Sequence, residues 1–183
     1  MTAGYSHQLT KEQAIDNSRL WFYVLLGTAT ASNLVYYCTA PLVGVGTIAG
    51  STVSRRKAIA VVLCMWCFNQ FLGFTVRDYP YTPSTFAWGI VMGVGAILAV
   101  LLSTVKLSSV RKQPGGSYIW FLASLLLGYG IYELILWISS FALGGTENFT
   151  ASILWDVLAG NAVWAIVLGL VHYLLVQRWR DRV

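Results

Sequence analysis

Long apolar runs separated by short clusters of basic residues are the feature that most constrains the fold of this chain. The clearest run covers residues 58–74, follows the basic triplet at 55–57, and is interrupted only by Asn69 and Gln70. A run of this length suits a helix that crosses the hydrocarbon core of a bilayer, and basic residues are typical of the cytoplasmic end of such a helix. A turn with two prolines and two tyrosines follows, at 77–83.

The composition agrees with a membrane environment. Of 183 residues, 57% are hydrophobic and only 10% are charged, which leaves too little polar surface for a water-soluble globule. We therefore expect one integral membrane domain, residues 18–183, preceded by a polar tail at 1–17. The net charge of +5 lies in clusters beside apolar runs, a pattern that fits membrane topology and argues against nucleic-acid binding.

Six apolar segments predict an all-α integral membrane protein, a bundle of six transmembrane helices. The predicted helices cover residues 20–37, 42–54, 57–75, 85–104, 118–143 and 151–177. The second of these is short and rich in glycine, so it must be tilted, partly re-entrant or covered by its neighbours. Five helices are also possible if the first two segments fuse into one.

The positions of the basic residues decide between six helices and five. With six helices, the basic clusters at 55–57, 106–112 and 178–182 all lie on one side of the membrane. With five, those clusters would stay together, but the tail with Lys11 and Arg19 would move to the opposite side. Because basic residues concentrate on the cytoplasmic side, we prefer six helices with both termini in the cytoplasm.

With this topology, polar residues within the helices concentrate in the outer half of the bundle. They are Asn33, Asn69, Gln70, Glu133, Asp156 and Asn161. Among them, Glu133 is the most informative, because a carboxylate at the centre of a span costs about 2.5–3.5 kcal/mol on insertion scales. It needs a partner, a proton or a water-filled cavity.

Aromatic residues share the faces of these polar residues. Tyr129, Glu133 and Trp137 are four apart and form one stripe, and Trp66 and Gln70 are related in the same way. Aromatic walls with a few amides and carboxylates suit a pocket for a small, flat, polar molecule, and an acidic member favours a ligand with positive charge or several donors. The candidate substrate-binding residues are Trp66, Asn69, Gln70, Trp88, Tyr129, Glu133, Trp137, Asp156, Asn161 and Trp164.

A packing role for the same residues stays open. Tryptophan and tyrosine anchor helices at membrane interfaces, and asparagine and glutamine within spans often only bond to neighbouring helices.

Other chemistry is poorly supported by the sequence. Cys64 and Cys67 have CxxC spacing, but they lie inside an apolar helix without a second ligand pair, which favours packing over metal binding. His172 is a lone histidine in the last helix, since His7 lies in the tail, so haem ligation by two histidines is not expected. No catalytic motif is present, and we expect no catalytic residues, no cofactor and no enzymatic activity.

These features together resemble the substrate-binding component of an energy-coupling factor transporter. The resemblance is architectural: it rests on the size, the six-helix plan, the short glycine-rich second helix, the polar outer residues, and Gly27 with Ala31 four apart on the first helix. In that family the membrane subunit captures a vitamin or related micronutrient from outside, and a small-residue face docks on a coupling subunit driven by ATPases. The resemblance implies that Gly27 and Ala31 belong to such a docking face, in a bacterial plasma (inner) membrane.

Our leading hypothesis is therefore a non-enzymatic subunit that captures a vitamin-like solute and works with coupling and ATPase subunits. The alternative is a structural or assembly subunit of a larger membrane complex, whose aromatic surface contacts lipid or other subunits.

Overall fold

The computed structural model describes residues 19–36, 40–105 and 115–180, and all regular structure in these ranges is helical. The α-helices are α2 (Arg19–Val35), α3 (Leu42–Thr52), α4 (Arg55–Thr75), α5 (Pro83–Ser103), α7 (Gly116–Leu143) and α8 (Ala151–Arg180), with a 3₁₀ turn, η1 (Thr146–Asn148), between the last two. The expectation of an all-α protein is confirmed. The tail at 1–17, Lys106, Arg111, Lys112 and Arg182 lie outside the described residues, and so does the side chain of Arg180.

The helix boundaries follow ordinary start and stop signals. Helix α5 begins at Pro83, and the Thr82 hydroxyl oxygen accepts a hydrogen bond from the backbone N–H of Thr85 at 3.3 Å. Proline suits the first helical position because a backbone N–H there has no partner within the helix, so the lack of an N–H costs no hydrogen bond. Helix α7 ends before Gly144, whose φ of 84° is accessible to glycine at little cost.

Four of these helices are long and apolar enough to cross a membrane: α4, α5, α7 and residues 151–178 of α8. Such helices indicate a multi-pass membrane protein. Helix α3 has 11 residues, which corresponds to about 16 Å and thus to about half of the hydrocarbon core. The count of six crossing helices stays a prediction.

Helix α3 occupies the centre of the bundle. It contacts every other described α-helix, and each residue from Leu42 to Gly50 is buried. A short helix exposes unpaired backbone groups at both ends, and within a membrane these groups require cover from protein. Of the three alternatives expected for the second segment, tilted, partly re-entrant or covered, the structure shows cover by its neighbours.

Glycines permit the close approach of α3 to its neighbours. A Cβ added to Gly46 would lie 2.7 Å from a methyl group of Val100, and one added to Gly50 would overlap Ser103, both on α5. The Ser103 hydroxyl also donates to the carbonyl oxygen of Gly46 at 3.3 Å. Small residues at these positions let the two helix backbones pack directly.

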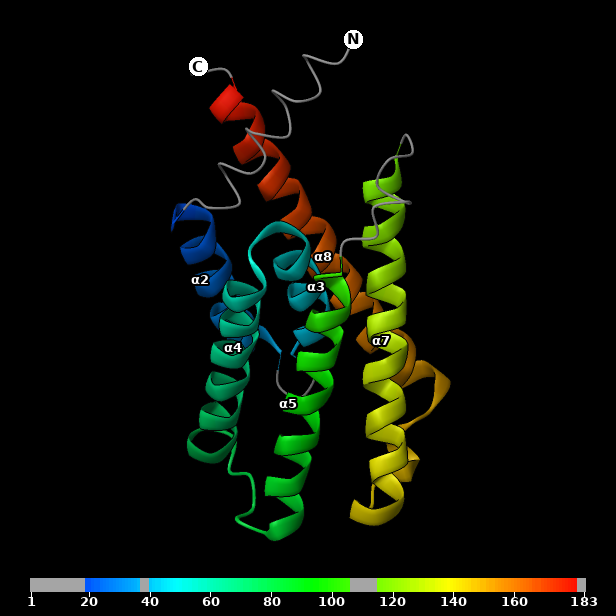
Figure 1. The fold of residues 1–183 in the computed structure, drawn as a ribbon. Coiled ribbons are helices and arrows are strands. Elements are labelled where there is room, and N and C mark those ends of the chain that lie inside the picture. The colour runs from blue at the N-terminus through cyan, green and yellow to red at the C-terminus, as the bar shows by residue number, and fades with distance from the viewer. Residues whose placement is uncertain (1–18, 37–39, 106–114, 181–183) are drawn as a thin grey trace.

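Basic side chains gather at one end of the bundle, which we call the basic end. Helices α2 and α4 begin toward this end and α5 and α8 end toward it, in the upper half of the view in Figure 1. The described basic residues at this end are Arg19, Arg55, Arg56, Lys57 and Arg178. The opposite end carries the connections 76–82 and 144–150.

Candidate functional site

The structure distributes the ten candidate binding residues over several helix interfaces. Four of them make a hydrogen bond to a neighbouring helix: Trp66, Asn69, Tyr129 and Asn161. Glu133 and Trp137 on α7 and Asp156 on α8 make no side-chain hydrogen bond with a described residue. These interfaces determine which polar groups remain available for a ligand.

The interface between α2 and α4 contains two buried amides. The Asn69 side-chain NH₂ donates to the Asn33 side-chain oxygen at 2.9 Å, and the Asn33 NH₂ donates in turn to the Met65 carbonyl oxygen at 3.4 Å. Both asparagines are at most 3% exposed. Asn69 therefore uses its amide to join two helices.

Arg77 extends this polar region and was not among the candidate residues. Its guanidinium donates to the backbone carbonyl oxygens of Asn33 and Tyr36, at the carboxyl end of α2. Carbonyl groups at this end of a helix lack intrahelical partners and carry partial negative charge, which a cation stabilises. The sequence could have pointed to Arg77, because it is a lone basic residue at the predicted end of the bundle opposite the basic clusters.

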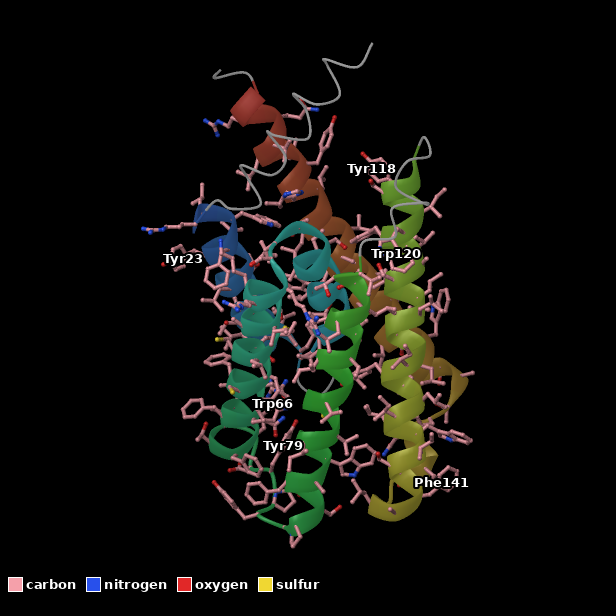
Figure 2. The ribbon with its side chains drawn as sticks, in the orientation of Figure 1. Tyr23, Trp66, Tyr79, Tyr118, Trp120 and Phe141 are labelled. Carbon is pink, nitrogen blue, oxygen red and sulfur yellow. The ribbon has the colours of Figure 1, made fainter. Side chains whose placement is uncertain are left out.

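At the interface of α4 and α5, Trp66 bonds to backbone. Its indole N–H donates to the Gly89 carbonyl oxygen at 2.8 Å, and a Cβ at Gly93 would lie 3.0 Å from the indole ring. Figure 2 shows the indole between the two helices. The Gln70 side chain lies against Gly89, where an added Cβ would meet its oxygen at 2.5 Å. The glycines of α5 thus accommodate the polar side chains of α4.

Asn161 joins α8 to the first turn of α3. Its side-chain oxygen accepts the backbone N–H of Gly44 at 2.7 Å, while its NH₂ donates to the Val157 carbonyl oxygen at 2.8 Å. The residue before α3 is Pro41, which offers no side-chain cap. Asn161 supplies the missing acceptor from another helix, 117 positions away in the chain.

Two further candidate tryptophans lie near loops or helix ends. The Trp164 ring lies 6.4 Å from the Tyr36 ring, measured between centroids, in an edge-on arrangement. Trp88 is half-buried at the start of α5, and an added Cβ at Gly145 would lie 4.0 Å from its ring.

The stripe on α7 differs from these interfaces. The Tyr129 hydroxyl donates to the Leu154 carbonyl oxygen of α8 at 2.5 Å. One turn further along, the Glu133 side chain is half-buried and makes no hydrogen bond or ion pair with any described residue. Trp137 is 45% exposed and packs edge-on against Phe141. The predicted stripe thus exists, and its carboxyl group is unpaired within the described chain.

Packing becomes sparse at the level of Glu133. Beyond Tyr132, only Ser140 among the remaining residues of α7 is buried, and no residue between 151 and 160 on α8 is buried. The exposed carboxyl group of Asp156 belongs to that segment of α8. In contrast, Asn161 begins the buried face that packs against α3. Glu133 therefore lies where the packed core ends.

The small residues of α2 lie on an outward face. Gly27 and Ala31 are exposed, and an added Cβ at Gly27 would have no heavy atom within 4 Å. Tyr23 and Leu34, 62% and 67% exposed, share this face. Figure 2 shows Tyr23 directed away from the bundle. No helix of the described chain packs on this surface.

The described ranges contain no group of three or more metal-ligating His, Cys, Asp or Glu residues. Cys64 and Cys67 are both exposed on α4 as free thiols, while Cys38 lies outside the described residues. The His172 ring packs against the Trp21 indole, with 4.9 Å between centroids.

No known protein-family model matches the chain, and no curated protein or solved structure is significantly similar to it.

Proposed function

We propose that this chain is a membrane-embedded subunit that captures a small vitamin-like solute for uptake across a bacterial plasma membrane, together with ATP-driven partner subunits. In this proposal the basic end faces the cytoplasm, following the usual excess of Lys and Arg on that side. Both termini are then cytoplasmic, and α2 and α3 complete a bundle of six membrane helices. Solute enters from the opposite end.

The observation that carries the proposal is the carboxyl group of Glu133, which makes no hydrogen bond or ion pair with any described residue. It lies in the middle of α7, a helix of 28 residues without other charged side chains. Ionisable groups within spans are expensive and usually face the bundle interior or a hydrated cavity, where they mark a substrate or ion pathway. Because Glu133 lies at the edge of the packed core, a solute can reach its carboxyl group from the sparsely packed end of the bundle.

The neighbouring side chains suggest the chemistry of the solute. Trp137 offers an aromatic face one turn from Glu133 on the same helix. A carboxylate beside aromatic rings favours a ligand that carries positive charge or several hydrogen-bond donors. The Tyr129 hydroxyl already donates to Leu154, so this residue contributes its ring to the proposed site.

Partner binding is assigned to the exposed face of α2. The glycine at 27 and the alanine at 31 allow the backbone of another helix to approach closely. In the mechanism, solute binding biases the protein between two states, and the ATP-driven partners supply the remaining free energy, because a ligand alone shifts an equilibrium only by its differential affinity.

The test is gentle purification of tagged protein from its native membrane, followed by mass spectrometry of co-purifying small molecules and proteins. We compare wild type with Glu133→Gln and with the matched control Glu147→Gln, whose side chain is exposed in η1. A small molecule present in wild type and in the control, and lost from Glu133→Gln, supports the proposal. Equal small-molecule content in all three samples contradicts it.

A structural or assembly subunit is the second candidate, and a specific observation favours it. Trp66, Asn69 and Asn161 each make a hydrogen bond to another helix, as expected of residues that only stabilise a bundle. Under this alternative, purification recovers a stable assembly without solute, and Glu133→Gln alters unfolding or assembly instead of solute content.

A further inference from the structure

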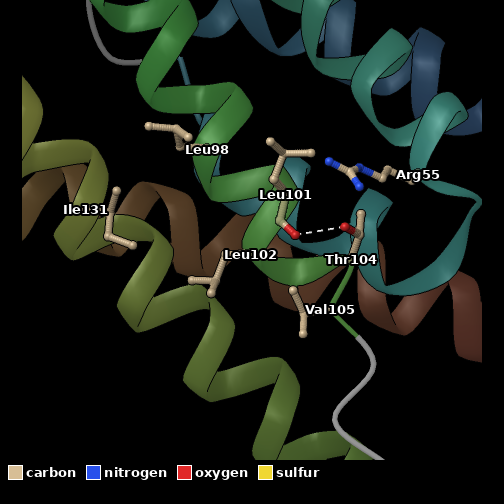
Figure 3. A pocket seen from close by; sticks show the side chains of 7 residues that line it. All are labelled: Arg55, Leu98, Leu101, Leu102, Thr104, Val105 and Ile131. Atoms are coloured by element: carbon tan, nitrogen blue, oxygen red, sulfur yellow. Dashed lines mark hydrogen bonds between the residues drawn. The ribbon is translucent and has the colours of Figure 1, made fainter.

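A groove of about 520 Å³ runs along α5 at the basic end of the bundle, and none of the ten candidate binding residues lines it. Figure 3 shows its lining: Leu98 and Leu102 of α5, Ile131 of α7, and Arg55 at the start of α4. Its volume lies within the ~300–1,000 Å³ typical of small-molecule sites. The lining is apolar along the helices and cationic at one edge.

We propose that this groove binds one anionic phospholipid of the adjacent leaflet. The acyl chain lies along Leu98, Leu102 and Ile131, and the phosphate contacts the Arg55 guanidinium. The groove follows α5 from Leu98 to Val105, a distance of about 10 Å along the helix axis. The groove thus runs from the membrane-spanning part of α5 to the end of that helix. A lipid extends in the same direction, from its acyl chains to its headgroup.

The charge of the groove selects the headgroup. Arg55 is exposed and makes no hydrogen bond or ion pair with any described residue, so its guanidinium is available to an anion. The Thr104 hydroxyl donates to the Leu101 carbonyl oxygen at 2.8 Å and adds no charge. Ser54 makes no side-chain cap on α4, so the positive end of that helix reinforces the potential around Arg55.

The neighbouring basic residues Arg56 and Lys57 differ from Arg55 in their surroundings. Arg56 is exposed but does not line the groove, and the Lys57 ammonium lies 5.9 Å from the centre of the Phe22 ring on α2. Of this triplet, only Arg55 both lines the apolar groove and carries a charge that is unpaired within the described residues. Headgroup preference should therefore depend on Arg55 and not on Arg56.

The experiment reconstitutes the full chain in vesicles of equal parts phosphatidylglycerol and phosphatidylcholine, extracts it in mild detergent, and counts retained lipids by native mass spectrometry. We expect wild type to retain phosphatidylglycerol preferentially and Arg55→Gln to reduce this preference about fivefold, since one basic residue near an anionic leaflet contributes ~1 kcal/mol. Arg56→Gln, with the same change of charge, should keep the preference.

A second variant tests the apolar part of the groove. Leu98→Trp fills it without altering charge and should lower the retention of both lipids, while Arg55→Lys should restore most of the headgroup preference. Equal preference in Arg55→Gln and Arg56→Gln would overturn the proposal, as would full lipid retention in Leu98→Trp. Displacement of phosphatidylglycerol by millimolar inorganic phosphate would also overturn it, since that would indicate a site for free anions. Far-UV circular dichroism of each variant verifies that the helices are intact.

Discussion

The contact between α3 and α8 gives the sharpest prediction about stability. A Cβ added to Gly44 would overlap the carbonyl oxygen of Asn161 and lie 2.9 Å from its carbonyl carbon. Ordinary contacts between carbon atoms begin at about 3.5 Å. Because the obstacle is backbone, no change of side-chain rotamer relieves the overlap, and Gly44→Ala must push the two helices apart by at least about half an ångström.

Separation of the helices also weakens the hydrogen bond from Gly44 N–H to the Asn161 side chain, now 2.7 Å long. Overpacking costs about 1–3 kcal/mol, and a hydrogen bond between membrane helices contributes about 0.6–1.7 kcal/mol. We therefore expect Gly44→Ala to lower the free energy of unfolding by ~2–4 kcal/mol. Gly27→Ala is the matched control: with no heavy atom within 4 Å of the added Cβ, it should change stability by less than ~1 kcal/mol.

The assay is equilibrium unfolding in mixed micelles, in which the fraction of sodium dodecyl sulfate is raised and helicity is followed by far-UV circular dichroism. Equal midpoints for Gly44→Ala and wild type would refute the close packing of α3 on α8. A loss of stability in Gly27→Ala as large as that in Gly44→Ala would refute the assignment of an open face to α2.

Three further substitutions are checked by the same titration. Trp66→Phe removes the indole N–H that bonds to Gly89 and should cost ~0.5–1.5 kcal/mol; an unchanged midpoint would contradict that bond. Thr47→Val keeps the side-chain shape but removes a buried hydroxyl that has no described partner, so stability should rise by ~1–3 kcal/mol, and a fall would show that the hydroxyl is paired. Arg77→Met removes donors to the end of α2 and should cost ~1–3 kcal/mol, whereas a stability gain would mean that burying this cation is unfavourable.

Much of the helical plan was accessible from the sequence, because long apolar runs, proline and glycine mark where membrane helices begin and end. The segment at 57–75 became α4 from Arg55 to Thr75, and the segment at 118–143 became α7 from Gly116 to Leu143. The length and composition of the short glycine-rich segment predicted that it is tilted, partly re-entrant or covered by its neighbours, and only the structure shows which of these holds.

The grouping of polar residues was not accessible in the same way. A helix in lipid is apolar on nearly all sides, so periodicity does not indicate which face meets which neighbour. Asn33 and Asn69 both count as outer-half polar residues, yet their pairing depends on the rotation of α2 against α4. Asn161 looked like a ligand-binding amide, and only the position of α3 revealed its backbone partner, Gly44.

The central position of α3 has a consequence for biogenesis. Its 11 residues are too few to insert alone, and its first turn is capped by Asn161, which is synthesised 117 positions later. At about 5–20 residues per second, that delay is roughly 6–23 s. Helices α4, α5 and α7, which also contact α3, are synthesised within this interval, but the first turn of α3 still lacks the Asn161 acceptor. The amino-terminal third of the protein thus completes its structure only when the last helix arrives.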